Sequence, residues 1–185
     1  MPGFIRPQLA TLKVKAPSGA LWIHEIKYDG YRVQLRIDGD DRRAYTRNGY
    51  DWVSRFSRIA GAFDVEGQAI VDGEVVVIHE GRTNFSELQA DLGRGDQDRL
   101  LYFAFDLLWL DGRDLRKEPQ IERKRLLNEL MEERALKEQP PAGDCFVGRS
   151  GQGWWIRAAL RFGYHRSGLA GSNGICVQAC RAWIC

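Results

Sequence analysis

The clearest hydrophobic pattern in the first third of the chain is a strict alternation over residues 31–37, where apolar side chains take every second position. Alternation with a period of two predicts a half-buried β-strand. A looser alternation over residues 21–27 predicts another strand before it. Asp29 and Gly30 lie between the two, and Asp-Gly is a strong signal for a two-residue hairpin turn. We therefore expect a β-hairpin here, followed by a strand over residues 43–47.

The next segments mix helical and strand patterns. Asp51 is expected to cap a helix, and Asn84 with Glu87 resembles a capping box that begins a second helix, ending near Leu92. Between them, residues 69–78 form an apolar strand that we expect to be interrupted at residues 72–74. The first helix presents one apolar face, formed by Trp52, Val53, Phe56, Ile59, Ala60 and Phe63.

Residues 100–110 are apolar except for Asp106, which predicts a strand buried on both faces. A helix over residues 119–136 follows, with proline in its first turn. No sustained period of either kind is present beyond residue 144. The helix is expected to direct five residues toward the core, namely Ile121, Leu126, Leu127, Leu130 and Met131.

Composition narrows the class of protein. The chain has 185 residues, of which 44% are hydrophobic, enough to bury a substantial core in one domain. No stretch reaches the roughly 18–20 apolar residues of a membrane helix, and the start lacks the apolar centre of a signal peptide. We expect a cytoplasmic protein without a membrane partner. The net charge of +2 favours no particular partner.

Residues 145–185 differ in composition from residues 1–144. They contain all four cysteines and five arginines but no lysine and no acidic residue. We therefore expect one domain over residues 1–144 and an atypical tail over residues 145–185. An alternative for the tail is a zinc site, although its cysteine spacing lacks a paired C-x₂-C knuckle. That site would consist of His165, Cys176, Cys180 and Cys185. Disulfides are not expected in a cytoplasmic protein.

A lysine and an arginine flank the expected turn. In a two-residue hairpin, Lys27 would lie opposite Arg32, and facing like charges are destabilising unless an anion lies between them. A phosphate would supply that anion. The cationic neighbour would also favour the deprotonated amine that nucleophilic attack requires. The alternative is that both are ordinary solvated surface cations.

Carboxylates embedded in apolar strands are a second signal, because burying a charge is costly without a partner. Glu25, Glu74 and Asp106 are of this kind. They are candidates to accept hydrogen bonds from a ligand or to help bind a metal. Internal ion pairs or positions at strand ends remain the alternative for each. Three such residues near one lysine and arginine favour a nucleotide pocket.

Four motifs resemble those of the covalent nucleotidyltransferases, the superfamily of DNA ligases, RNA ligases and mRNA capping enzymes. Residues 25–32 resemble the nucleophile motif Lys-x-Asp-Gly-x-Arg, residues 46–51 the next motif, residues 71–76 the acidic motif and residues 102–112 the aromatic motif. The order and spacing of the four motifs also agree with the superfamily. The sequence between the motifs is similar to that of ATP-dependent DNA ligases of the bacterial end-joining type. The resemblance covers about residues 7–136.

The resemblance implies a covalent mechanism. Lys27 would attack the α-phosphate of ATP, expel pyrophosphate and hold AMP, which then passes to a DNA 5′-phosphate before the nick is sealed. Asp29 would assist the sealing chemistry, and Arg47 would lie near the phosphate and the DNA end. Mg²⁺ is implied as a cofactor beside ATP, with Glu74 as a candidate ligand. The implied partners are nicked or broken double-stranded DNA and other end-joining proteins, in DNA repair and recombination.

The resemblance also implies the residues that bind ATP. Glu25 and the backbone of Ile26 would read the adenine, and Phe105 would stack on it. Arg32 and Glu74 would hold the ribose. The implied fold is α+β, an ATP-grasp-like nucleotidyltransferase core of antiparallel sheets flanked by helices.

Two further motifs of the superfamily are missing after residue 144, as is an OB-fold domain. These motifs supply a glutamate for the metal and lysines for the phosphates, whereas the tail contains neither residue type. We therefore expect the core to be incomplete at its C-terminal end, and the tail to be a truncated or frameshifted sequence. Two alternatives to an active DNA ligase stay open: an RNA ligase or capping-type enzyme, and an inactive ligase remnant.

Overall fold

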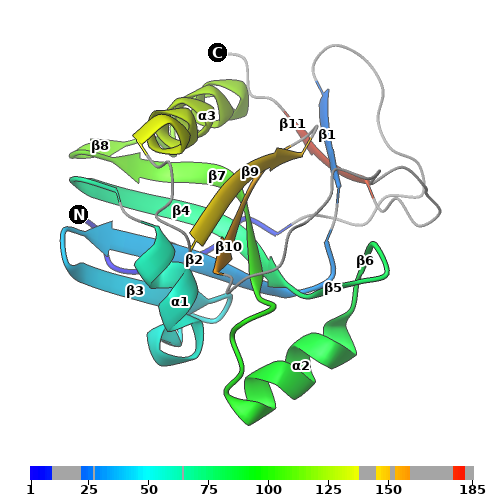
Figure 1. The fold of residues 1–185 in the computed structure, drawn as a ribbon. Helices are drawn as coiled ribbons and strands as arrows, with labels where there is room; N and C mark the ends of the chain where they lie inside the picture. Colours follow the sequence, from blue (N-terminus) through cyan, green and yellow to red (C-terminus); the bar gives the residue numbers. More distant parts are fainter. Residues whose placement is uncertain are drawn as a thin grey trace.

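The computed structural model describes residues 1–9, 22–26, 28–63, 65–137, 145–150, 153–158 and 177–181. The largest sheet in the described part of the chain is built from β2 (Tyr31–Asp38), β3 (Asp41–Thr46), β4 (Gln68–Val76), β7 (Leu101–Leu110), β8 (Arg113–Asp114), β9 (Cys145–Ser150) and β10 (Gly153–Ala158). These seven form one sheet in the spatial order β3, β2, β4, β7, β10, β9, with β8 paired to β7 (Figure 1). Every pairing is antiparallel.

The other elements surround this sheet. They are the strands β1 (Trp22–Ile26), β5 (Ile78–His79), β6 (Arg82–Thr83) and β11 (Val177–Arg181), and the helices η1 (Val53–Phe56), α1 (Ser57–Ala62), α2 (Phe85–Arg94) and α3 (Gln120–Lys137). β1 pairs with β11, and β5 with β6. Antiparallel sheets flanked by a few helices confirm the expected α+β class.

One face of the central sheet carries the main hydrophobic core. Val33, Leu35 and Ile37 of β2 point to this face, as their alternation predicts, and all three are buried. Tyr102 on β7 is fully buried, and its hydroxyl lies 3.0 Å from the carbonyl oxygen of Val33. Burial raises the pKa of this phenol well above its ordinary value. The central strands are therefore tied together by a polar contact inside the core.

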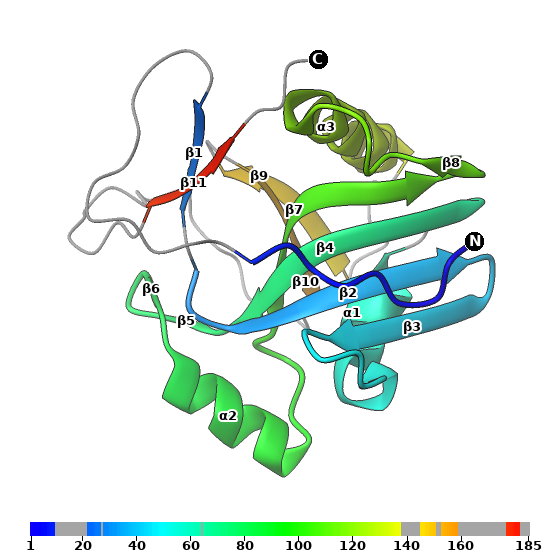
Figure 2. The same ribbon diagram turned by 180° about the vertical axis from the view of Figure 1, so that it is seen from behind.

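The opposite face of β2 carries Arg32, Gln34 and Arg36, and the N-terminal segment crosses it (Figure 2). The amide of Gln34 exchanges two hydrogen bonds of 2.9 Å with the backbone of Ile5. Arg36 donates to the Pro2 carbonyl, and Arg32 donates to the Gln8 carbonyl. Alternate side chains of one strand therefore hold residues 2–8 across the sheet.

The predicted hairpin at Asp29-Gly30 is wrong. Both edges of β2 are occupied, by β3 and β4, so β1 has no free edge to pair with. A type I′ or II′ turn needs a positive φ, and neither residue has one. Gly30 serves a different purpose, because a Cβ there would lie 2.2 Å from the carbonyl oxygen of Val75. The glycine allows the chain to pass closely against β4.

Three other expectations needed correction. β4 runs unbroken through Asp72, although its register with β7 shifts between Asp72 and Gly73. The helix after Asp51 is divided into η1 and α1; Asp51 accepts a 3.0 Å hydrogen bond from the Val53 amide. Ile121 is 61% exposed and does not face the core, because the helix buries the face that carries Leu127 and Met131.

The predicted cap of the second helix is confirmed, and part of the tail is described. Asn84 caps α2 by accepting a 3.0 Å hydrogen bond from the Glu87 amide. Part of the atypical tail belongs to the main sheet, since β10 pairs with β7. Of the zinc alternative, only Cys180 lies within the described residues, on β11.

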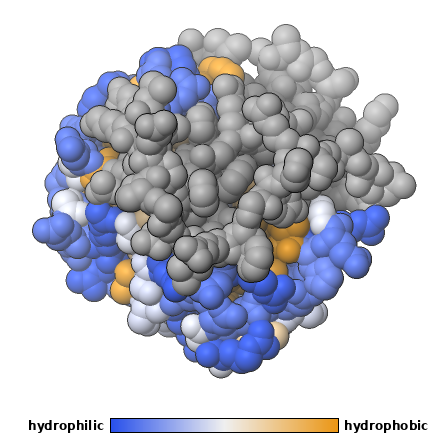
Figure 3. Space-filling view, viewed as in Figure 1, coloured by the Kyte–Doolittle hydropathy of each residue, from blue (hydrophilic) through white to orange (hydrophobic). Residues whose placement is uncertain are grey.

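The surface in the view of Figure 1 is mostly hydrophilic where it is described, with hydrophobic side chains in small separate patches (Figure 3). Among the described helices, none combines the length and apolar character that crossing a membrane would require.

Candidate functional site

The candidate site lies on the sheet face opposite the main core. Arg32 of β2 and Glu74 of β4 are directly opposed in the strand register, and Glu74 in turn faces Phe103 of β7. On either side of these three residues, the members of the core cluster occupy the alternate positions of each strand. Pleating therefore brings charged and aromatic residues from the three central strands onto one surface.

Arg32 is held by a buried carboxylate. Its Nε lies 3.2 Å from Oδ1 of Asp72, and its Nη2 lies 2.7 Å from Oδ2. The Asp72 side chain is 3% exposed and the Arg32 side chain 20%. Burial raises the pKa of the Asp72 carboxyl above its ordinary value, and the ion pair with Arg32 opposes that rise. This bidentate pair fixes the guanidinium plane.

One aromatic ring lies against the arginine, and a stacked pair of rings lies on the neighbouring part of β7. The guanidinium carbon of Arg32 lies 5.3 Å from the centroid of the Phe105 ring, a cation–π distance. Tyr28 stacks on Phe103 with centroids 4.0 Å apart and planes inclined by 12°. Phe103 and Phe105 are two residues apart on β7. The surface therefore combines a fixed cation with flat apolar rings, which suits a ligand that has both a base and phosphates.

Helix α3 supplies the cations that pair with two of the predicted carboxylates, Asp106 and Glu25. Arg123 donates to both oxygens of Asp106, at 2.8 and 2.9 Å. Lys124 forms an ion pair with Glu25 and donates a 2.8 Å hydrogen bond to the carbonyl of Phe105. For Asp106 and Glu25, the structure therefore shows the internal ion pairs that were the alternative to ligand contacts.

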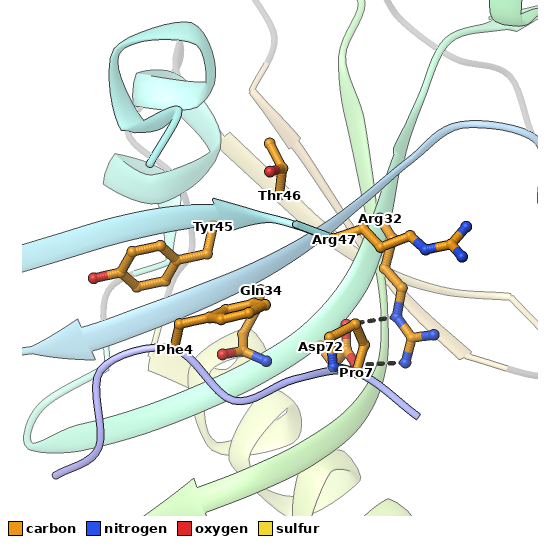
Figure 4. Close-up of a pocket in the computed structure, with 8 residues that line it drawn as sticks. All are labelled: Phe4, Pro7, Arg32, Gln34, Tyr45, Thr46, Arg47 and Asp72. Atoms are coloured by element: carbon orange, nitrogen blue, oxygen red, sulfur yellow. Dashed lines mark hydrogen bonds and ion pairs between the residues drawn. The ribbon is translucent and has the colours of Figure 1, made fainter. Parts of the chain in front are cut away.

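Arg47 lies beyond the end of β3 and lines a small pocket with Arg32, Thr46 and Asp72. Figure 4 shows this pocket, with the dashed contacts between Arg32 and Asp72 and the N-terminal residues Phe4 and Pro7 along its side. Arg47 is exposed, and within the part of the chain that the structure describes it has no ion-pair partner. The pocket thus adds a second guanidinium close to the first.

Three other residues predicted for the site do not form part of this described surface. Lys27 lies outside the described residues, between β1 and Tyr28. Asp29 is exposed, and its backbone amide contacts the Thr83 hydroxyl at 3.4 Å. Ile26 is the last residue of β1, opposite Val177 of β11. Among the described residues, no group of three or more His, Cys, Asp or Glu side chains is placed to hold a metal ion.

Sequence reasoning missed two residues of this surface. Asp72 is the buried partner of Arg32, and Lys124 is the partner of Glu25. Asp72 carried the same signal as Glu74, a carboxylate within an apolar strand. Lys124 carried no comparable signal, because a charged residue on an amphipathic helix is ordinary.

The sequence is similar to a known protein family and to individual proteins. Residues 8–140 match a family model described as "ATP dependent DNA ligase domain". The chain is 40% identical over 137 residues to the multifunctional non-homologous end joining protein LigD of Pseudomonas aeruginosa, covering 72% of this chain and 16% of that protein. It is 34% identical over 141 residues to the bifunctional LigD of Bacillus subtilis, covering 67% and 23%.

Two solved structures are also similar. A mycobacterial DNA ligase D complexed with ATP and MES aligns with a TM-score of 0.61 and 34% identity, covering 68% of this chain and 42% of that one. The ligase domain of Mycobacterium tuberculosis LigD aligns with a TM-score of 0.55 and 31% identity, covering 60% and 38%. The chain thus spans less than a quarter of the length of both end-joining relatives named above.

Proposed function

This chain belongs to the ATP-dependent DNA ligase domain family, and we propose that it binds ATP and transfers AMP to its own Lys27 as the first step of DNA ligation. The observation that carries the proposal is the family match over residues 8–140, which includes the whole Lys27-Tyr-Asp-Gly-Tyr-Arg32 motif. The ATP-bound state of the mycobacterial relative supports the choice of nucleotide for this chain.

The proposed reaction is a displacement at phosphorus. The unprotonated Nζ of Lys27 attacks the α-phosphorus of ATP, a P–N bond forms, and the bond to the bridging oxygen breaks so that pyrophosphate leaves with the electron pair. The amine loses its proton to solvent or a nearby base. Covalent catalysis of this kind divides a difficult condensation into easier steps. AMP then passes to a DNA 5′-phosphate, and the 3′-hydroxyl displaces it, with Asp29 assisting.

The described contacts support the remaining roles. Arg32 is oriented by Asp72 beside the Phe105 ring, in a position suited to the ribose when adenine stacks on that ring. Glu74, opposite Arg32 in the register, is proposed to share the ribose. Glu25 and the Ile26 backbone are proposed to contact the adenine edge. Arg47, exposed beside Arg32, suits a phosphate or the DNA end.

Mg²⁺ remains part of the proposal as an ion that accompanies the triphosphate and offsets its charge. Glu74 is its candidate protein ligand. Among the described residues, no cluster of His, Cys, Asp and Glu side chains offers further ligands. The proposed substrate is nicked or broken double-stranded DNA in the cytoplasm, with other end-joining proteins as partners.

The test is incubation with α-labelled ATP and Mg²⁺, followed by denaturation. We expect label that stays on the protein and is lost in Lys27→Ala, while Lys117→Ala, at an exposed lysine outside the site, keeps it. Label that survives in Lys27→Ala would refute Lys27 as the nucleophile. Labelling by GTP, or sealing of nicked RNA in preference to DNA, would instead favour an RNA ligase or capping-type enzyme.

The division of the chain near residue 144 remains a proposal about the origin of the tail. Translating the other reading frames past codon 144 tests it, because a frameshift predicts that one frame restores a Glu-Gly-Val-type motif. If no frame restores such a motif, the frameshift is refuted.

A further inference from the structure

Lys124 differs from the other cations of α3 in what it joins. Its ammonium contacts the Glu25 carboxylate on β1 and the Phe105 carbonyl on β7, which belong to two different sheets. Its neighbour Arg123 instead binds Asp106 on β7 and the Glu118 carbonyl just before the helix. Lys124 therefore fixes where a carboxylate of one sheet lies relative to the aromatic surface of the other.

The bond leaves Glu25 with a defined accepting position. Lys124 donates to Oε1, and within the described part of the chain Oε2 has no hydrogen-bond partner. Both side chains are largely buried, with 19% of Lys124 and 18% of Glu25 exposed. A partly buried carboxylate oxygen without a partner favours a ligand that donates a hydrogen bond.

Purine bases differ at the atom that such an oxygen would meet. Adenine has an exocyclic amine that donates, whereas guanine has a carbonyl oxygen that accepts at the equivalent position. A carboxylate can only accept, so it pairs with the first and repels the second. Lys124 holds that carboxylate near Phe105, the residue proposed to stack on the base, and this placement converts the difference into selectivity.

We infer that Lys124 is a positioning residue for nucleotide selectivity: by holding Glu25 against β7 it makes the site accept adenine and reject guanine. This inference rests on the proposed function, since it concerns the same nucleotide site. Lys124 itself contacts neither the base nor the reacting phosphorus, so it acts through Glu25.

The experiment compares the wild-type chain with Lys124→Met, Lys124→Arg and the control Lys117→Met, an exposed lysine before α3. Dissociation constants for ATP and GTP are measured by calorimetry, and the concentration dependence of the single-turnover Lys27 labelling rate gives a half-saturating ATP concentration and a maximal labelling rate. We expect Lys124→Met to weaken ATP binding about tenfold, as for a lost hydrogen bond to a charged group. GTP binding and the labelling rate at saturation should change little, so selectivity falls by a similar factor.

Two further variants separate positioning from a general structural effect. Lys124→Arg keeps a cation and should retain most of the selectivity, with thermal unfolding confirming that each variant folds. In a Glu25→Gln background, Lys124→Met should change the ATP-to-GTP ratio by less than about twofold, because residues that act through one another are not additive.

The possible outcomes distinguish this inference from the proposed function. An unchanged ATP-to-GTP ratio in Lys124→Met, or equal weakening of both nucleotides, overturns the inference while Lys27 labelling stands. Absence of Lys27-dependent label with a selectivity that still depends on Lys124 overturns the proposed function alone. A wild-type chain that binds neither nucleotide overturns both.

Discussion

Replacing Asp72 by alanine tests the interaction that orients the site arginine. The substitution removes a carboxylate that is 3% exposed and leaves the Arg32 guanidinium without its bidentate partner. Removing one partner of a buried ion pair costs about 3–5 kcal/mol. Arg32 is 20% exposed and retains the Gln8 carbonyl at 2.9 Å, so we expect a loss at the low end, about 3 kcal/mol.

The assay is equilibrium unfolding in urea, supported by thermal unfolding. For a chain of this size, each kcal/mol corresponds to about 2–4 °C in Tm, so the expected fall is about 6–12 °C. Asp40→Ala is the matched control because Asp40 is exposed in the turn between β2 and β3, and it should change stability by less than about 0.5 kcal/mol.

A double-mutant cycle then identifies the cause. The cycle tests whether the loss of stability comes from the Arg32 guanidinium that is left without its carboxylate partner. If it does, Asp72→Leu combined with Arg32→Met is less destabilising than the sum of the two single substitutions by about 1 kcal/mol or more. A loss below about 1 kcal/mol in Asp72→Ala, or strict additivity in the cycle, would show that the pair does not hold the site.

Three further substitutions test the frame around the site. Gly73→Ala should destabilise the chain strongly in urea unfolding, because the new Cβ would lie 2.4 Å from the Tyr102 ring; wild-type stability would show that this close approach is absent. Asn84→Ala should cost about 1 kcal/mol through loss of the helix cap, and a cost near zero would contradict the capping bond. Hydrogen bonds from Arg116 lower the pKa of Asp114 to about 2. The ionised carboxylate therefore stabilises the fold at pH values above its unfolded-state pKa of about 4, and this contribution is lost as the pH falls toward 2. An NMR titration should show this pKa return toward its ordinary value in Arg116→Ala, and no change would refute the pairing.

Local patterns predicted most elements because each depends on neighbours in the chain. The alternation in β2, the capping box of α2 and the apolar run of β7 all match the structure. Predictions that needed knowledge of partners failed. The Asp29-Gly30 dipeptide carries a hairpin signal, but pairing of β2 with both β3 and β4 leaves no edge for β1.

The same distinction between local sequence patterns and tertiary partners applies to the candidate site. The sequence by itself predicted which residues carry the chemistry, because the segments that contain Lys27, Glu74 and Phe105 resemble motifs of the nucleotidyltransferases. Only the tertiary structure decided their partners, since strand register and helix docking set which charges meet across about 40 to 100 residues. Burial then makes such pairs obligatory, because a carboxylate removed from water needs a cation or a donor. That is why Asp72 holds Arg32 and Lys124 holds Glu25.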